Sequence, residues 1–502
     1  MKRFLDRSGT APSSQAMAFL LVLLVAITYV ALAASHTRAF SSDSWSYLDL
    51  SQTIFGDFYR PSTVRSFGEN AGYSRSFPLL WPVAIAVANR VTNWGASTLP
   101  FLAAAAGLAI VIPVWIIAHA TIRRRAVARL AAVVLWASIL LSVDFIDEVQ
   151  AGRSIPAALL LLLSGVAVAV RRDDDRPIDA ILFGLLLGLA ALTRFDVVPI
   201  VGVLLLCFIS RRRVRVSVRI VAVVAFVATV SPWLVYSLRH YHTPWASDNT
   251  QVALAAVQRD VTDYRVPAAT IRTDPRRWLV RVARNVPSLI ASFQAALLVF
   301  PGSILALAAL AGCWPRRWRA SAQVPAIKWL AMSVMASLAA LASLAVTGYF
   351  DARYFIYVCA FVTITATLFV LRTLAPVRLA VRLALAFSCI AALPRAISVV
   401  RRASRAAEPS SISSQDRQWA RGALIERHVV LDFSGHCFEF GAVTRVRTVC
   451  PPPDWSSLSD AERRQLVLAY HVTDVRGAPE TTGAEPTIRP IGGVGAAPWE
   501  IR

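Results

Sequence analysis

Long apolar runs separated by short polar stretches dominate the first 400 residues of this chain. About eleven such runs can be distinguished, near residues 17–35, 98–119, 127–143, 154–170, 178–193, 196–210, 218–238, 287–311, 329–347, 354–372 and 383–400. Each is close to the roughly 20 apolar residues with which a helix crosses a bilayer. The pattern therefore predicts an all-α polytopic membrane bundle of about 11 transmembrane helices.

Arginines gather in every second loop between these runs. The clusters lie at 123–125, 171–176, 211–215, 316–319 and 372–382. Basic loops stay in the cytoplasm, so we expect these loops and the N-terminus on the cytoplasmic side, with the first run retained as a span. The prediction is a multi-pass protein of the bacterial cytoplasmic (inner) membrane. Its first long loop, 36–97, and its tail then face the periplasm or the exterior.

Residues 77–90 (FPLLWPVAIAVANR) are apolar but short, with two prolines near their start. Counting this segment as a span would place every later arginine cluster outside. We therefore expect a helix that lies on or dips into the outer membrane face, as part of the first external loop.

The last hundred residues are polar and differ from the rest of the chain. A Ser- and Arg-rich linker at 401–418 follows the predicted transmembrane domain of 1–400, and 419–502 form an external module. Strand-like alternation at 428–433 and 442–449 predicts a small α/β or mostly β module. In an oxidising compartment Cys437 and Cys450 form a disulfide, and the alternative is two free thiols.

The composition excludes several other classes of protein. Hydrophobic residues make up 56% and charged residues 16%, whereas soluble proteins carry about a quarter charged residues. The net charge of +22 would suggest nucleic acid in a soluble domain. Here the basic residues lie in loops between apolar runs, so we expect membrane lipid as the partner and no nucleic acid. No Cys/His spacing predicts a metal site.

Several carboxylates follow apolar runs on the predicted external side. Asp43 comes just after the first run, where it could act as a general base; the alternative is that it caps a helix. Asp147 and Glu148, with Asp144 and Arg153 nearby, could supply a second base or bind a cation. The alternative for this acidic turn is ordinary solvation of a loop.

Cationic and aromatic residues on the same predicted side could hold a phosphate. Arg194 interrupts two apolar runs, so it either faces a partner such as Asp196 or an anionic ligand, or reaches the membrane boundary with its long side chain. The guanidinium group of Arg353 suits phosphate because its donors form a planar fork. Further candidates on this side are Tyr354, Arg75, Arg239 and His242.

The order of short motifs along the chain resembles that of the GT-C-fold membrane glycosyltransferases, the group of the protein O-mannosyltransferases and the lipid A aminoarabinose transferase. The motifs are Asp43 with Tyr47-Leu48, the segment PLLWP at 78–82, LTRFD at 192–196, Pro232-Trp233 and DARYF at 351–355. One departure concerns the family's Ser-Glu-Pro, which reads Ser154-Ile155-Pro156 here. Asp147 or Glu148 would then have to replace the missing acid.

The resemblance implies an activity. Family members transfer a sugar from a polyprenyl-phosphate donor to a lipid, glycan or protein outside the cytoplasmic membrane. The first-loop acid, here Asp43, would be the catalytic base, and Arg353, Arg239 and Arg75 would hold the donor phosphate. No cofactor is required, and a divalent cation is optional. The alternatives are a transporter or flippase of lipid-linked glycans, for which we find no internal repeat, and a membrane anchor for the tail module.

Overall fold

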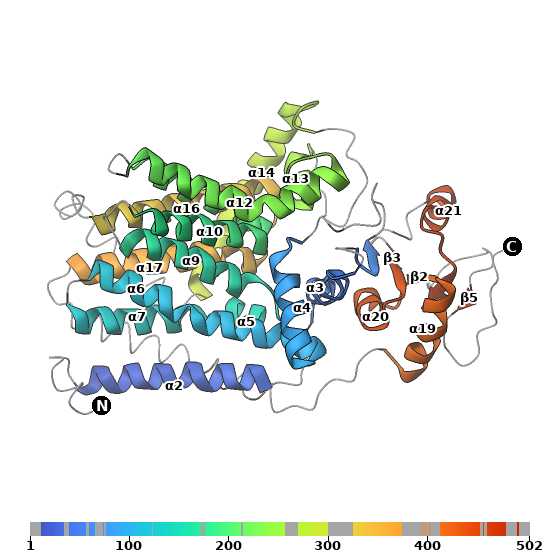
Figure 1. The fold of residues 1–502 in the computed structure, drawn as a ribbon, viewed down its shortest axis with the longest axis horizontal. Coiled ribbons are helices and arrows are strands. Elements are labelled where there is room, and N and C mark those ends of the chain that lie inside the picture. Colours follow the sequence, from blue (N-terminus) through green and yellow to red (C-terminus); the bar gives the residue numbers. More distant parts are fainter. Residues whose placement is uncertain are drawn as a thin grey trace. The chain divides into compact units, whose positions relative to one another are not determined.

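The computed structural model is mostly helical and divides into two compact units (Figure 1). It describes residues 12–34, 40–56, 60–65, 74, 77–122, 124–171, 176–211, 214–256, 270–299, 325–373, 394, 397, 401, 412–451, 455, 459–477 and 489–490. The first unit comprises Met1–Ala39, Pro100–Leu234 and Leu279–Ala407. The second comprises Phe40–Leu99, Val235–Trp278 and Glu408–Arg502.

Helices form most of the described part of the first unit, and three of them extend a few residues into the second unit. Most of them coincide with the apolar runs of the sequence. They are α2 (Pro12–Ala34), α5 (Thr98–Ala109), α6 (Val111–Thr121), α7 (Arg125–Leu140), α8 (Val143–Gln150), α9 (Ile155–Arg171), α10 (Pro177–Thr193), η2 (Phe195–Val197), α11 (Val198–Ile209), α12 (Val216–Tyr241), α14 (Pro275–Val299), α16 (Pro325–Thr347), η3 (Ala352–Phe355) and α17 (Ile356–Thr373). The run at 383–400 lies almost entirely outside the described residues.

Two helices among the described residues are long and apolar enough to cross a membrane by themselves, Gly95–Thr121 and Val216–Tyr241. The bent pair α7–α8 would make a third span. Several shorter apolar helices, such as α9 and α10, have 17 residues each. The eleven predicted spans are therefore not confirmed, although the helices themselves are present.

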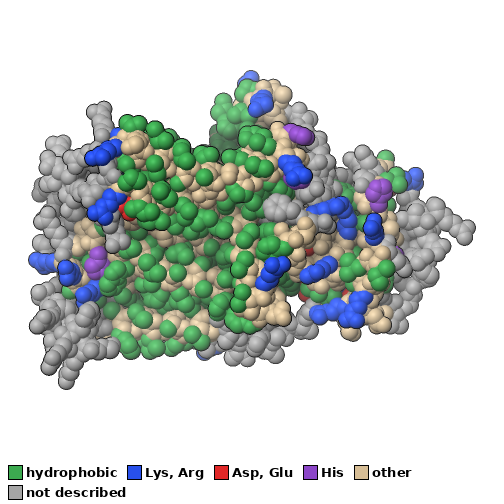
Figure 2. Space-filling model, viewed as in Figure 1, with side chains coloured by type: hydrophobic (Ala, Val, Ile, Leu, Met, Phe, Trp, Pro, Cys, Tyr) green, Lys and Arg blue, Asp and Glu red, His purple; other side chains and the backbone are tan. Residues whose placement is uncertain are grey.

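The helices of the first unit pack closely and expose apolar side chains. Helix α9 packs against α6 and α10, and α16 packs against α11 and α17. In α10, a methyl group at Gly184 would overlap the Ala222 carbonyl of α12, and one at Gly188 would lie 2.6 Å from the Thr229 Cβ. Small residues four apart let membrane helices approach in this way. Apolar side chains also cover much of the outer helical face (Figure 2), as expected of a surface in contact with lipid.

The second unit contains a parallel sheet with helices on both faces. Its strands are β1 (Thr63–Arg65), β2 (Val429–Asp432), β3 (Arg447–Cys450), β4 (Asp474–Arg476) and β5 (Arg489–Pro490), in the order β1-β3-β2-β4-β5. Its helices are α3 (Ser42–Thr53), α4 (Leu80–Thr92), η1 (Gly95–Ser97), α13 (Asp248–Leu254), α19 (Ser414–Glu426), α20 (Cys437–Thr444) and α21 (Asp460–Ala469).

Alternate residues of β2 enter two different cores. Val429 and Leu431 pack with Tyr470 beside α21, whereas Val430 packs with Phe440 of α20. Both faces of the sheet are therefore covered, as parallel sheets require. The tail module is α/β.

The edge strand β1 comes from the first long loop and not from the tail. Thr63 pairs with Thr448 and Val64 with Val449. The predicted strand at 428–433 is confirmed as β2, but the segment 442–449 was only partly right. Helix α20 continues to Thr444, and Arg445 ends it with a φ of 64° before β3 begins at Arg447.

Candidate functional site

Three sequence motifs meet in the first unit, where α10 and η2 join. Arg194 ends α10 in an extended conformation and is 9% exposed. Its Nε donates to Asp196 Oδ1 at 2.9 Å and its Nη2 to Asp196 Oδ2 at 2.9 Å. Its Nη1 lies 3.5 Å from the Ser154 hydroxyl oxygen, at the start of α9. Of the two alternatives for Arg194, the structure shows the paired one.

The late motif DARYF brings a second guanidinium group to this site. Asp351 caps η3 by accepting from the Arg353 backbone N–H at 3.2 Å, and its Oδ2 lies 3.2 Å from the Arg353 Nε. The Arg353 Cζ is 5.0 Å from the centre of the Tyr354 ring, and the Arg194 Cζ is 5.9 Å from it. Two guanidinium groups therefore share one aromatic ring, and cation–π attraction holds both near it.

Glu148 adds a buried carboxylate to the same cluster. It lies on α8, which packs against η3, and it is only 1% exposed. Its Oε1 forms an ion pair with Arg153, and the guanidinium groups of Arg194 and Arg353 lie near enough to interact with its charge. Among the described residues, its Oε2 has no hydrogen-bond partner. A buried carboxylate oxygen is costly without a partner, so this atom is a candidate contact for a bound group.

The two neighbouring acids Asp147 and Glu148, which the sequence offered as equal candidates, differ in burial in the structure. Asp147 is exposed, whereas its neighbour Glu148 is buried in the cluster. The buried Trp233 of the Pro-Trp motif supports the same region, because its ring lies 5.0 Å from that of Phe195. We refer to Glu148, Arg153, Arg194, Asp196, Arg353 and Tyr354 as the charged cluster.

Asp43 lies in the first turn of α3, in the second unit. Ser41 provides the N-cap, and Ser41 and Ser44 form a capping box. The N-cap is therefore Ser41 and not Asp43, which is half-buried in the first turn of the helix. The motifs of the first loop also meet here: α3 packs against α4, and the Tyr47 and Phe77 rings are 4.7 Å apart.

The remaining predicted phosphate ligands belong to the second unit or lie outside the described residues. Arg239 is exposed near the end of α12, and His242 is exposed just after it with a φ of 53°. Both belong to the second unit. Arg75 lies outside the described residues.

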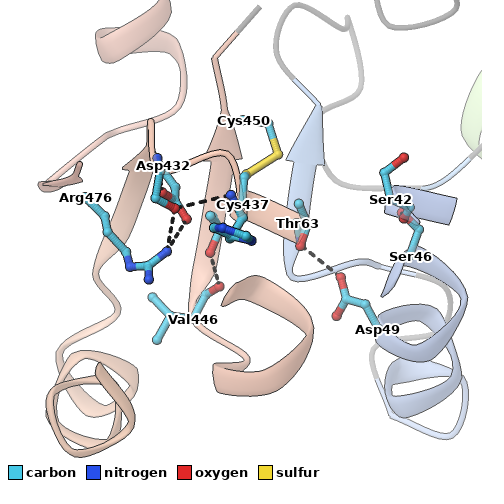
Figure 3. Close-up of a disulfide and its surroundings, with 12 residues drawn as sticks. Ser42, Ser46, Asp49, Thr63, Asp432, Cys437, Val446, Cys450 and Arg476 are labelled. Carbon is cyan, nitrogen blue, oxygen red and sulfur yellow. Dashed lines mark hydrogen bonds and ion pairs between the residues drawn. A yellow bond between two sulfur atoms is a disulfide. The ribbon is translucent and has the colours of Figure 1, made fainter. Parts of the chain in front are cut away.

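The sequence reasoning missed the residues that join α3 to the sheet (Figure 3). The Thr63 backbone N–H donates to Asp49 Oδ2 at 2.9 Å, and Asp49 is 1% exposed. Burial raises the pKa of Asp49, and hydrogen bonds from Thr63 and Ser62 offset part of that rise. On the next turn, Gln52 Nε2 donates to the Ala442 carbonyl at 3.3 Å and Gln52 Oε1 accepts from Arg445 Nε at 2.9 Å. No sequence signal marked Asp49 or Gln52, because both partners come from distant segments.

The two tail cysteines are joined in the structure. A disulfide links Cys437, at the start of α20, to Cys450, at the end of β3 (Figure 3). Beside it, Arg476 Nη1 bonds Asp432 Oδ2 at 3.0 Å and the Ser434 hydroxyl at 2.7 Å. These buried charges satisfy one another and hold β2 to β4.

No metal site can be identified in the part of the chain that the structure describes, since no three His, Cys, Asp or Glu side chains there form a group that could hold an ion. The chemistry of the charged cluster is instead that of guanidinium groups around an aromatic ring. Such groups bind an anionic ligand through charge-assisted hydrogen bonds.

Comparisons with known proteins identify the fold. No family model and no curated protein sequence matches the chain. Among solved structures, the Archaeoglobus fulgidus oligosaccharyltransferase in complex with Zn and sulfate matches with a TM-score of 0.57 and 16% identity. This match covers 86% of the present chain but only 62% of that protein.

Two further structures contain lipid phosphates. The oligosaccharyltransferase AglB from Archaeoglobus fulgidus, in complex with an inhibitory peptide and a dolichol-phosphate, has a TM-score of 0.59 at 14% identity and covers 91% of this chain and 69% of that one. ArnT from Cupriavidus metallidurans, bound to undecaprenyl phosphate, has a TM-score of 0.53 at 11% identity and covers 88% of this chain and 87% of that one. Both proteins have the GT-C fold, so the resemblance read from the sequence is confirmed for the fold.

Proposed function

We propose that this GT-C-fold chain is an integral membrane glycosyltransferase. It transfers a sugar from a polyprenyl-phosphate donor to a lipid, glycan or protein acceptor on the external face of the cytoplasmic membrane. The observation that carries the proposal is the charged cluster, because three segments that are distant in the sequence assemble it within a fold shared with ArnT and AglB.

In this proposal the cluster binds the phosphate of the donor. Arg353 and Arg194 supply the guanidinium donors, and Tyr354 keeps the two groups in place. Arg239, His242 and Arg75 are the further candidate ligands that the sequence suggests. Glu148 orients the cations through Arg153 and is the better candidate for the second carboxylate, because Asp147 is exposed.

Asp43 would act as the general base. It takes the proton from the acceptor hydroxyl or amine as that group attacks the anomeric carbon, and the bond from this carbon to the phosphate oxygen breaks. The phosphate leaves with the electron pair as an anion, and the guanidinium groups stabilise its charge. The leaving group needs no proton, so one base and positioned cations suffice and a divalent cation stays optional.

The change of Asp43 to Asn tests this function. Membranes containing the protein would receive polyprenyl-phosphate sugars carrying a radioactive label, and label in non-polyprenyl products would be measured. We expect the loss of one general base to lower transfer roughly 10²- to 10⁴-fold, with undecaprenyl phosphate binding unchanged. Asp460→Asn, an exposed acid on α21, is the matched control.

Two results would oppose the proposal. Full transfer by the Asp43→Asn variant would remove the assigned base. Movement of lipid-linked sugar across vesicle membranes without transfer, by the unmodified protein, would favour a flippase.

A further inference from the structure

We propose that the tail module positions the helix that carries Asp43, and that Asp49 and Gln52 are the positioning residues through which it acts. This inference rests on the proposed function, because it concerns the placement of the proposed base. It requires only contacts within the second unit.

The tail holds α3 at two successive turns. Asp49 accepts from the backbone of Thr63, and Thr63 lies on β1, which is hydrogen-bonded to β3 of the tail. Gln52 bonds directly to the Ala442 carbonyl of α20 and to the Arg445 side chain that follows it. The first turn of the same helix carries Asp43. One rigid element therefore connects the tail to the proposed base.

Neither α3 nor β1 is expected to keep its place without this support. Helix α3 has 12 residues, and helices shorter than about 12–15 residues are marginal in water without tertiary contacts. Strand β1 has three residues, which pair with β3 alone among the described strands. Helix α3 also packs against α4, so its orientation depends on α20 and β3 in addition to that helix.

The disulfide and one glycine fix the surface on which α3 and β1 rest. Cys437–Cys450 joins the start of α20 to the end of β3, the two tail elements that contact α3 and β1. Gly441 of α20 faces β1 so closely that a methyl group there would overlap the Thr63 hydroxyl. Without that hydroxyl, the shortest contact of the methyl group would be with the Thr63 Cβ at 3.3 Å, which a shift of a few tenths of an ångström would relieve.

This geometry provides a test with an internal rescue. Gly441→Ala should push β1 away from α20, whereas Gly441→Ala combined with Thr63→Ala removes the hydroxyl and restores the space. Thr63→Ala alone keeps the backbone N–H that bonds Asp49 and serves as the control. A misplaced catalytic group can cost roughly 100-fold in rate, so we expect Gly441→Ala to lower kcat 10- to 100-fold with little change in the donor KM. We expect the double variant to recover to within about threefold of the unmodified rate.

Hydrogen exchange of the full-length protein in detergent provides a readout without activity. The amides of residues 42–53 should exchange faster in Gly441→Ala and after reduction of the disulfide, and at the original rate in the double variant. Asp49→Ala and Gln52→Ala should show the same increase and the same fall in kcat.

The outcomes separate the two proposals. Unchanged exchange in α3 in both Gly441→Ala and the reduced protein would overturn the positioning role. Failure of the double variant to restore protection would overturn the route through β1 and Asp49, because the contact between Gly441 and Thr63 would then not be what displaces α3. Altered exchange together with no transfer by the unmodified protein would leave the mechanical link intact and refute the glycosyltransferase.

Discussion

Replacing Arg353 with alanine should weaken lipid phosphate binding far more than it weakens the fold. The ion pair of Arg353 with Asp351 spans 3.2 Å, and the two side chains are 21% and 56% exposed. Exposed pairs of this kind contribute about 0.2–1 kcal/mol to stability. A hydrogen bond to a charged ligand is worth about 1.5–3 kcal/mol, which corresponds to a rise of about 10- to 150-fold in Kd.

The assay is titration of the purified protein with undecaprenyl phosphate in detergent, followed by calorimetry, with thermal unfolding measured in parallel. Arg421→Ala, which removes an exposed arginine of α19, is the matched control and should leave Kd unchanged. Arg353→Lys keeps the charge but not the planar fork, so we expect an intermediate Kd. An unaltered Kd in Arg353→Ala would refute the assignment of the charged cluster as the phosphate site.

Three further predictions concern stability. Arg476→Met should lower the free energy of unfolding of the second unit by about 3–5 kcal/mol, because it leaves the fully buried Asp432 carboxylate without its ion-pair partner. Thermal unfolding in detergent would measure this loss, and a loss below about 1 kcal/mol would contradict the prediction. Burial raises the pKa of Asp49 in the folded protein. The contribution of Asp49 to the free energy of unfolding is therefore complete below the pKa of the unfolded chain and is lost as the pH rises through the pKa of the folded protein. The unmodified protein should therefore lose stability relative to Asp49→Asn as the pH rises above about 4, the ordinary pKa of an aspartate, and parallel curves would be inconsistent with this. Gly184→Ala should separate α10 from α12 and lower the melting temperature, because the added methyl group overlaps the Ala222 carbonyl. Gly202→Ala is the control, since a methyl group there meets open space. Equal melting temperatures of the two variants would show that the close approach of α10 and α12 is unimportant.

Much of the helical fold and part of the charged cluster could be predicted from the local sequence. Arg194 and Asp196 are two residues apart, so their pairing could be anticipated from the cost of a charge between apolar runs. The burial of Glu148 beside an exposed Asp147 could not, because it depends on how α8 packs against η3.

The edge strand could not be predicted for a different reason. Three residues, Thr63–Arg65, are too few to show alternation, and their partner strand lies near the other end of the sequence. The error at 442–449 had a local cause: Ala442 to Thr444 alternate like a strand but form the end of a helix that Arg445 terminates. Helix and strand patterns are ambiguous in runs this short.

The pairing of Thr63 with Thr448 has a consequence for biosynthesis. These residues are 448 − 63 = 385 positions apart, and a ribosome adds roughly 5–20 residues per second. The early strand therefore waits on the order of 20 to 80 s for its neighbour, while the intervening helices are made. During that interval its open backbone edge is available to other nascent chains, so the yield of correctly assembled protein should depend on how quickly synthesis is completed.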